Sequence, residues 1–200
     1  MPEFSNDNLT LYSGAGERKY INQAERRRVL AAMERLERER ALFSLLLAWT
    51  GGRISEVLAV CPASFQIGRN IVTLRTLKRR RTHFREVPIM PTLMIALDHH
   101  FEVRALQQDP ETAHRRLWSC SRVTAWRFVK RAMLEAGVYG RPACPRGLRH
   151  GFGVATLQAS VPLNLVQRWM GHARLSTTAI YTSVSGDEEA DFAARFWSPE

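Results

Sequence analysis

Apolar and polar residues repeat along this chain with two periods, which predict several helices and one small sheet. Apolar residues three or four positions apart, as at Val29, Met33 and Leu36, indicate a helix with one buried face. Asn22 and Glu25 are spaced like a capping box, which predicts where this helix begins. The later predicted helices cover about residues 41–49, 53–60, 91–103, 122–135, 148–158, 163–170, 177–184 and 188–196.

Three short runs between the early helices predict strands, at residues 65–67, 71–75 and 85–89. Residues 68–70 are a turn sequence between the first pair, and residues 78–82 turn the second pair. Because the strands precede most of the helices, the predicted fold class is α+β rather than alternating α/β. We expect a mainly α protein with a small three-stranded antiparallel sheet on its flank.

Length and composition indicate one domain with a packed core. The chain has 200 residues, of which 45% are hydrophobic. Residues 1–19 are polar with two glycines, so we expect a loose N-terminal lead-in before a domain over residues 20–200. No apolar run approaches the ~20 residues of a membrane span, and the first residues do not resemble a secretion signal.

The charge indicates the partner. A net charge of +10 is unusually basic for a cytosolic enzyme without a charged partner, and it predicts binding to a polyanion, nucleic acid rather than membrane. We therefore expect a cytoplasmic protein associated with the nucleoid. The three cysteines, Cys61, Cys120 and Cys144, are far apart and odd in number, which indicates reduced thiols rather than disulfides. His99 and His100 would diverge on a helix, so we predict no metal site.

Five residues far apart in the sequence have the side chains of a phosphodiester-cleaving site: Arg53, Lys78, Arg149, His172 and Tyr181. Arginines hold phosphate in bidentate geometry, and a lysine can protonate a leaving alkoxide. A histidine can donate a hydrogen bond to a phosphate oxygen, and a tyrosine can attack phosphorus. Each residue alone also fits an ordinary surface, capping or packing position. Their joint occurrence in this order favours the chemical interpretation.

The local sequences are more specific than the residue types. They are Thr50-Gly-Gly-Arg-Ile-Ser-Glu56, Gly147-Leu-Arg-His-Gly-Phe152, and a Gly171-His172 pair nine residues before Tyr181. At these residues the chain resembles the tyrosine recombinases, also called the phage integrase family, from about residue 20 onward. The resemblance implies site-specific DNA recombination without metal, ATP or another cofactor.

The resemblance also implies a role for each of the five residues. Tyr181 would attack a DNA phosphodiester and form a 3′-phosphotyrosyl link, while Lys78 protonates the leaving 5′ hydroxyl. Arg53, Arg149 and His172 would stabilise the crowded phosphorus. The family carries its lysine on the hairpin before a Val-Pro pair, and Lys78 matches if the loop is about two residues longer. Otherwise Lys78 is one more phosphate contact.

Three further residues are auxiliary candidates. Glu56 could pair with Arg53 and orient it, and His150 fits a core histidine bonded to backbone. Arg146 is a departure, because the family has a histidine three residues before Arg149. An arginine cannot act as a base but can bind phosphate. Three outcomes are open: the charge of Arg146 suffices for activity, the activity is weakened, or another group accepts the tyrosine proton. If Arg146 acts only as a phosphate ligand, we expect the rate of DNA cleavage to rise with pH.

Two basic segments are candidates for DNA binding: the hairpin 75–85, which also holds Arg85, and the helix 122–135. The hairpin could enter a groove of DNA, and the basic face of the helix could lie in the major groove or simply be solvated. The predicted contact residues are Arg79, Arg80, Arg81, Arg127, Lys130 and Arg131.

The end of the chain suggests self-association. Residues 187–197 predict an acidic-capped helix with Phe192, Phe196 and Trp197, and in the family such a segment docks on a neighbouring protomer. We therefore expect dimers or tetramers on double-stranded DNA, with accessory DNA-bending proteins as possible partners. The chain resembles small recombinases that consist of the catalytic domain alone. Two alternatives stay open: a type IB topoisomerase-like enzyme, and a non-catalytic DNA-binding protein with a decayed site.

Overall fold

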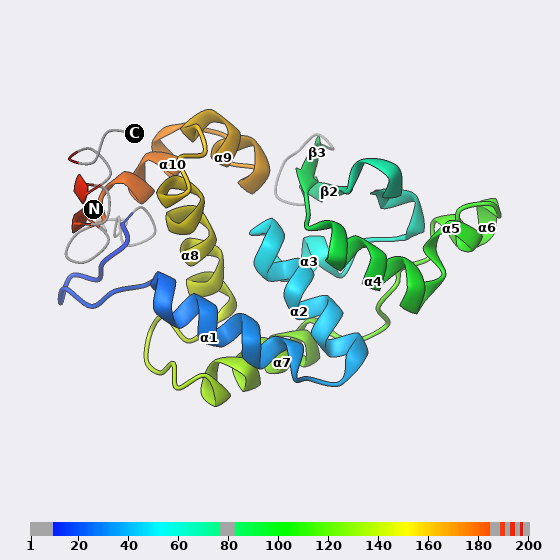
Figure 1. Ribbon diagram of the computed structural model, residues 1–200, viewed down its shortest axis with the longest axis horizontal. Coiled ribbons are helices and arrows are strands. Elements are labelled where there is room, and N and C mark those ends of the chain that lie inside the picture. The colour runs from blue at the N-terminus through cyan, green and yellow to red at the C-terminus, as the bar shows by residue number, and fades with distance from the viewer. Residues whose placement is uncertain (1–9, 77–82, 185–188, 191–192, 195–196, 198–200) are drawn as a thin grey trace, which may run out of the picture.

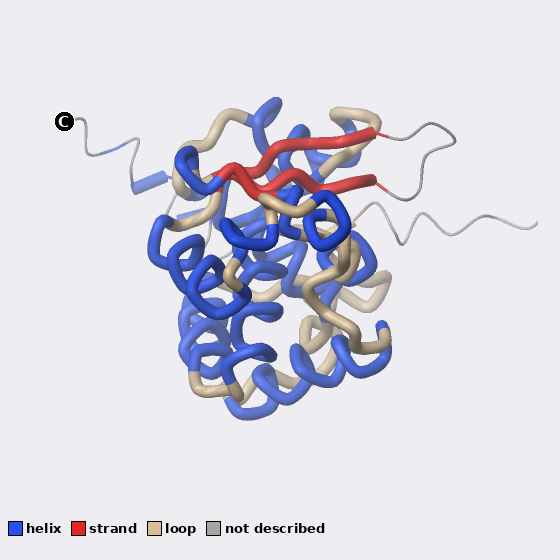
Figure 2. The backbone as a smooth tube through the Cα atoms, turned by 90° about the vertical axis from the view of Figure 1, so that its right-hand side faces the viewer, coloured by secondary structure: helices blue, strands red, loops and turns tan. Residues whose placement is uncertain are grey.

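The computed structural model describes residues 10–76, 83–184, 189–190, 193–194 and 197, and all structural statements concern these residues. They form a mainly helical domain with a three-stranded antiparallel sheet, as predicted. Figure 2 shows the sheet lying along one side of the helical body. No helix in this described part is long and apolar enough to cross a membrane.

Two helices near the N-terminus organise the core. Helix α1 (Gln23–Glu34) begins at the predicted capping box, where the Glu25 backbone N–H donates to the Asn22 side chain over 2.8 Å. Helix α2 (Arg38–Thr50) buries most of its residues, including Phe43. It packs against α1, α4 (Pro91–Phe101), α7 (Arg122–Glu135) and α8 (Pro145–Gln158), and so lies at the centre of the domain (Figure 1).

The sheet follows the predicted strand pattern closely. Strands β1 (Phe65–Gln66), β2 (Ile71–Thr76) and β3 (His83–Pro88) pair in the order β1-β2-β3. Val72 pairs with Val87, and both are buried. Because side chains alternate between the two faces of a strand, Arg85 shares the buried face with Val87.

Helices make up most of the remaining structure, and some of their boundaries differ from the predicted ones. The predicted helix 177–184 divides into α10 and a 3₁₀ turn, Ile180–Thr182, and two short helices at residues 103–106 and 110–113 were not predicted. The helices are α3 (Ile54–Val57), α4 (Pro91–Phe101), α5 (Val103–Leu106), α6 (Pro110–Ala113), α7 (Arg122–Glu135), α8 (Pro145–Gln158), α9 (Leu163–Met170) and α10 (Ser176–Ala179).

Helix α8 begins three residues earlier than predicted. Pro145 stands in the first turn of α8. The N–H groups of a first turn have no acceptor within the helix, so the missing N–H of proline costs no hydrogen bond there. Arg146 therefore lies within the helix, one turn before Arg149, rather than in a turn leading to it. The two residues consequently share one face of α8.

A second apolar cluster lies beside the main core, between α8, α9 and the chain before α1. Leu11 and Tyr20 are buried in it, and Tyr12 pairs with Arg18 across a tight turn. Of the expected loose lead-in, Leu11 and Lys19 are buried against the domain, whereas residues 14–17 are exposed. The predicted helix 187–197 and the hairpin turn 78–82 lie wholly or mostly outside the described residues.

Candidate active site

Arg53 is positioned by a glycine turn at the end of α2. Gly51 has the left-handed φ of +57°, and a side chain there would collide with the ring of Phe152. This turn sets Arg53 as the N-cap of α3, half-exposed, with its backbone N–H donating to Glu56 over 2.9 Å. The close contact with Phe152 also brings α8 against the turn.

Glu56 is the centre of an ion-pair network. Its carboxylate binds Arg53 Nη1 at 2.8 Å and Arg85 Nη2 at 2.6 Å, and the residue is only 1% exposed. Burial alone would raise the pKa of Glu56, but the charges and hydrogen bonds of Arg85 and Arg53 outweigh it and lower that pKa. The expected pairing of Glu56 with Arg53 is therefore present, and Glu56 fixes the guanidinium.

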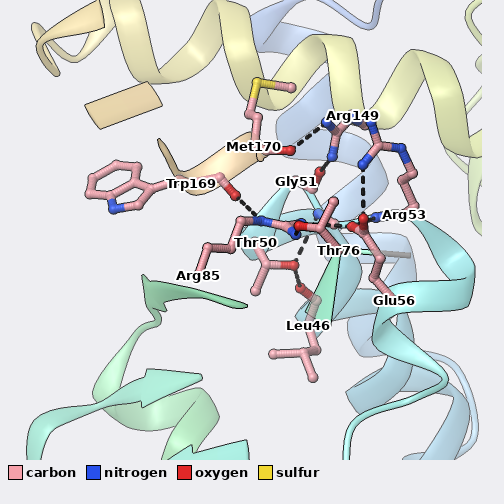
Figure 3. Close-up of polar contacts among 11 residues, drawn as sticks. Leu46, Thr50, Gly51, Arg53, Glu56, Thr76, Arg85, Arg149, Trp169 and Met170 are labelled. Carbon is pink, nitrogen blue, oxygen red and sulfur yellow. Dashed lines mark hydrogen bonds and ion pairs between the residues drawn. The ribbon is translucent and has the colours of Figure 1, made fainter. Parts of the chain in front are cut away.

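Arg85 is part of this network rather than of a DNA-contacting surface. It is buried, and besides Glu56 it donates to Trp169 O over 2.7 Å and to Thr76 Oγ1 over 2.9 Å. Figure 3 shows these contacts converging from β3, α3 and α9. The sequence-based interpretation of Arg85 as one more basic residue of the hairpin was wrong, because its strand position directs it inward.

Arg149 extends from α8 into the same region. Its Nη1 donates to Gly51 O and its Nη2 to Met170 O, the latter over 2.6 Å (Figure 3). Burial, and after it the charge of Arg53, lower the pKa of Arg149 to about 10, so the guanidinium remains charged at neutral pH. Two carbonyl oxygens orient this cation without neutralising it, which leaves its charge available for an anion.

His172 follows the end of α9, where Gly171 adopts the left-handed φ of +67°. Its Nδ1 lies 2.9 Å from Thr178 Oγ1, and its ring stacks on that of Tyr181 with centroids 6.2 Å apart. Burial, and then the charges of Arg149 and Arg53, lower the pKa of His172 to about 3. His172 is therefore neutral at physiological pH and donates a proton from only one ring nitrogen.

Tyr181 is buried in the second apolar cluster, with 1% of its surface exposed. Its ring lies so close to α8 that a side chain at Gly153 would meet it at 2.6 Å. Burial raises the pKa of Tyr181 to about 12, against the opposing effect of Arg149 and Arg53. The phenol therefore keeps its proton at neutral pH in this state.

His150 has a different partner from the one expected. Its Nδ1 lies 3.1 Å from the Tyr181 hydroxyl, so a side chain 31 positions away rather than backbone satisfies it. Burial, followed by the charges of Arg149 and Arg146, lowers the pKa of His150 to about 4. Nothing in the local sequence indicated this contact, because it depends on the packing of α8 against the 3₁₀ turn Ile180–Thr182.

The structure brings four of the five predicted residues together. The charges of Arg53 and Arg149 act on both His172 and Tyr181, and Arg149 contacts the turns that carry Arg53 and His172. Lys78 falls outside the described residues, as do the candidate DNA contacts Arg79, Arg80 and Arg81.

The remaining candidates lie on two helices. Arg146 is exposed on the first turn of α8, on the face that also carries Arg149 and His150. On α7, Arg127 is exposed, Arg131 is paired with Glu135 at 2.8 Å, and Lys130 donates to Ala143 O over 3.0 Å. Of the predicted contacts on α7, Arg127 is the one with an exposed side chain that no described interaction engages.

Comparison with known proteins identifies the family. Residues 19–188 match the sequence pattern of the phage integrase family. The tyrosine recombinase XerA of Thermococcus kodakarensis is 29% identical over 170 residues, which cover 84% of this chain and 58% of that protein. A resolvase of Escherichia coli K12 is 29% identical over 213 residues, covering 91% of this chain and 78% of the resolvase.

Solved structures show the same fold. The crystal structure of XerA recombinase has a TM-score of 0.73 at 21% identity, covering 90% of this chain and 66% of its own. The catalytic domain of bacteriophage HP1 integrase has a TM-score of 0.61 at 17% identity, covering 90% of this chain and 95% of its own.

These matches confirm the family resemblance that the local sequences indicated. The chain spans less than three fifths of the length of the XerA relative, and the catalytic domain of HP1 integrase is matched over nearly its whole length. The chain belongs to the phage integrase family of tyrosine recombinases, and it corresponds to that family's catalytic region.

Proposed function

We propose that this chain carries out site-specific recombination by breaking and rejoining DNA strands through a 3′-phosphotyrosyl intermediate on Tyr181. The observation that supports this best is the convergence of two arginines, a neutral histidine and a tyrosine in one site. Tyr181 Oη attacks the phosphorus, the bond to the 5′ oxygen breaks, and a second 5′ hydroxyl later reverses the step.

The two arginines bind the scissile phosphate. Arg53 is held by a buried carboxylate and Arg149 by two carbonyl oxygens, so both guanidinium groups are oriented before DNA arrives. Preorganised charges cost no reorganisation when negative charge develops on the phosphate oxygens. By comparison with arginine fingers, each such arginine contributes about 10³-fold or more to the rate.

Lys78 donates the proton to the leaving 5′ hydroxyl. This assignment is carried by the family resemblance and by the chemistry of lysine, whose pKa can shift into a useful range where that of arginine cannot. The strands on either side of its turn support the proposal, because Arg85 of β3 and Thr76 of β2 both belong to the network around Glu56.

Tyr181 has to leave its buried position before it attacks. A side chain that is 1% exposed cannot reach a phosphate on DNA. The short α10 and the 3₁₀ turn that carry Tyr181 bury few residues, and this is the kind of segment that opens at low cost. We propose that DNA binding and contact between protomers release it.

The proposed partner is double-stranded DNA, with further copies of this chain on it. The net charge of +10 supports DNA binding, and the structurally similar recombinase XerH was solved bound to its difH substrate, with a TM-score of 0.67. Trp197, which is 72% exposed, belongs to the segment 187–197 that we propose docks on a neighbouring protomer.

A trapping assay tests the function. A target site is first selected from random-sequence DNA, and a nick is placed so that the cleaved fragment diffuses away and cleavage becomes irreversible. The protein should form a covalent complex that survives denaturant, while Tyr181→Phe should bind the DNA and form none. Tyr139→Phe, at a tyrosine that is 67% exposed, is the matched control and should react normally.

The same assay decides between the alternatives. Binding without a covalent complex would indicate a non-catalytic DNA-binding protein and contradict the proposal. A type IB topoisomerase-like enzyme would form the complex but relax supercoiled DNA without joining two sites, whereas a recombinase should yield products that combine two sites.

A further inference from the structure

Attack by Tyr181 requires an acceptor for its phenol proton. At neutral pH the buried phenol is protonated, because its pKa is raised to about 12. Arg146 stands where the family resemblance leads one to expect a histidine, and a guanidinium cannot accept a proton. A second group that accepts this proton would compensate for the missing histidine at neutral pH.

His150 is the group in contact with the reacting atom. Its Nδ1 lies 3.1 Å from the Tyr181 hydroxyl. A phenol hydroxyl can donate or accept a hydrogen bond, and it donates to Nδ1 in the tautomer that carries the imidazole proton on Nε2. This is the tautomer that a proton acceptor for Tyr181 requires.

The surroundings of His150 keep it unprotonated. Arg146 and Arg149 on its own helix and Lys19 from the chain before α1 are all cationic, and burial acts in the same direction, so the pKa falls to about 4. Tyr181, the titratable group across from it, is neutral. His150 is thus unprotonated but a weak base in the absence of DNA. A phosphate bound at Arg149 would offset part of the cationic field, raise the pKa of His150 and strengthen it as a base.

His172 is less suited to this step. Its Nδ1 is engaged with Thr178 Oγ1 at 2.9 Å, and its ring lies face to face with the ring of Tyr181, at 17° between the planes. Among the described contacts, the hydrogen bond of the Tyr181 hydroxyl is to His150 and not to His172. His172 is therefore placed to act on the phosphate and not on the phenol.

We propose that His150 is a catalytic residue that takes the phenol proton of Tyr181 during cleavage and returns it during rejoining. The inference rests on the proposed function of Tyr181 as nucleophile. In cleavage the segment that carries Tyr181 opens far enough to admit a phosphate, while Tyr181 Oη stays within reach of His150 Nδ1. The bond between Tyr181 Oη and phosphorus forms, the bond from phosphorus to the 5′ oxygen breaks, and the phenol proton moves to His150 Nδ1. Lys78 supplies the proton to the 5′ oxygen. Rejoining runs through the same transfers in reverse.

The cationic surroundings favour the return step. An imidazolium beside Arg146, Arg149 and Lys19 is a strong acid, so it readily gives its proton to the departing tyrosine when the second 5′ hydroxyl attacks. The arrangement therefore keeps the covalent intermediate short-lived. A recombinase gains from this, because an unresolved intermediate is a broken strand.

Single-turnover cleavage of the nicked substrate by His150→Gln tests the inference. Glutamine can still accept a hydrogen bond from the phenol but cannot take its proton. Cleavage near pH 7 should fall by about 100-fold or more while DNA affinity is retained. The wild-type rate should change little between about pH 6 and pH 9, whereas the variant's rate should rise about tenfold per pH unit as hydroxide replaces the base.

Two rescue variants separate a base from a packing residue. In His150→Ala, added imidazole should restore cleavage, and substituted imidazoles should restore it in the order of their pKa values. The double variant Arg146→His, His150→Gln places an imidazole one turn away on the same face of α8 and should recover part of the loss. A residue that only packs against Tyr181 would show neither response.

The outcomes are distinguishable. If the wild-type protein cleaves DNA and His150→Gln cleaves it at the same rate at every pH, the proposed role of His150 is overturned and that of Tyr181 stands. If the variants do not fold, the wild-type profile decides alone, because a tenfold rise per pH unit in the wild-type protein excludes a neutral imidazole base. If the wild-type protein forms no covalent complex, the proposed function fails and the role of His150 falls with it.

Discussion

At the scale of single residues, the site depends on one buried carboxylate. Glu56 joins the half-exposed arginine Arg53 to the buried arginine Arg85, and Arg85 in turn binds the carbonyl oxygen of Trp169 next to the contact of Arg149. Buried ion pairs add little net stability, but removing one partner leaves the other charge uncompensated. We therefore expect Glu56 to matter for both folding and phosphate binding.

Glu56→Gln should lower the free energy of unfolding by about 3 kcal/mol, because it leaves Arg85 buried without a counter-charge. Urea denaturation near pH 7 measures this, and Glu86→Gln, at an exposed carboxylate of β3, is the control, expected within about 0.5 kcal/mol of wild type. Equal stability of the two variants would contradict the role of Glu56.

The same residue predicts an acid dependence. The folded pKa of Glu56 lies below its ordinary value of 4.5, so its ionisation contributes stability that is fully present above that value. This contribution is lost as pH falls through the lower, folded pKa. In Glu56→Gln the loss should be smaller over this acid range, which thermal unfolding at a series of pH values would detect.

At the scale of elements, the sequence predicted what local pattern determines. The capping box at Asn22, the three strands and the bounds of α7 were right, because each depends on neighbouring residues. The start of α8 was missed although Pro145 is a helix-start signal. The burial of Arg85 could have been read from its alternation with Val87. The contact of His150 with Tyr181 could not, because tertiary packing alone creates it.

The proposed role of Lys78, in the hairpin between β2 and β3, can be tested by the chemistry of the leaving group. Lys78→Ala should slow cleavage of normal DNA by about 100-fold or more, because the leaving 5′ oxygen then lacks its proton. In a substrate with sulfur at the 5′ bridging position, the leaving group is a thiolate that departs without a proton. The variant should cleave this substrate at nearly the wild-type rate. Arg80→Ala is the control and should lower affinity and its salt dependence on both substrates alike. Equal defects of Lys78→Ala on both substrates would make Lys78 only a phosphate contact.

At the scale of the whole molecule, the structure has the fold of a tyrosine recombinase catalytic domain with Tyr181 buried. Figure 1 shows α8, α9 and α10 on one side of the site and α3 with the sheet on the other. The arginines are oriented, whereas Tyr181, the proposed nucleophile, is buried in the second apolar cluster together with Leu11 and Tyr20. Activation is thus proposed to be a movement of the segment that carries Tyr181.

Removal of residues 187–200 tests whether that activation depends on other protomers. The truncated protein should bind a single half-site with nearly unchanged affinity, because the arginine network and the sheet are retained. Assembly of two or more protomers on a full site should be lost, as band shifts and light scattering would show. Assemblies of unchanged size would contradict docking of this segment on a neighbour.

The central claim is that Tyr181 becomes covalently attached to DNA. Peptide mapping of the trapped complex by mass spectrometry, after nuclease digestion, tests it most directly. We expect a nucleotide 3′-phosphate on the peptide that contains Tyr181. The same adduct on Tyr12, Tyr20 or Tyr139, with an unmodified Tyr181, would contradict it.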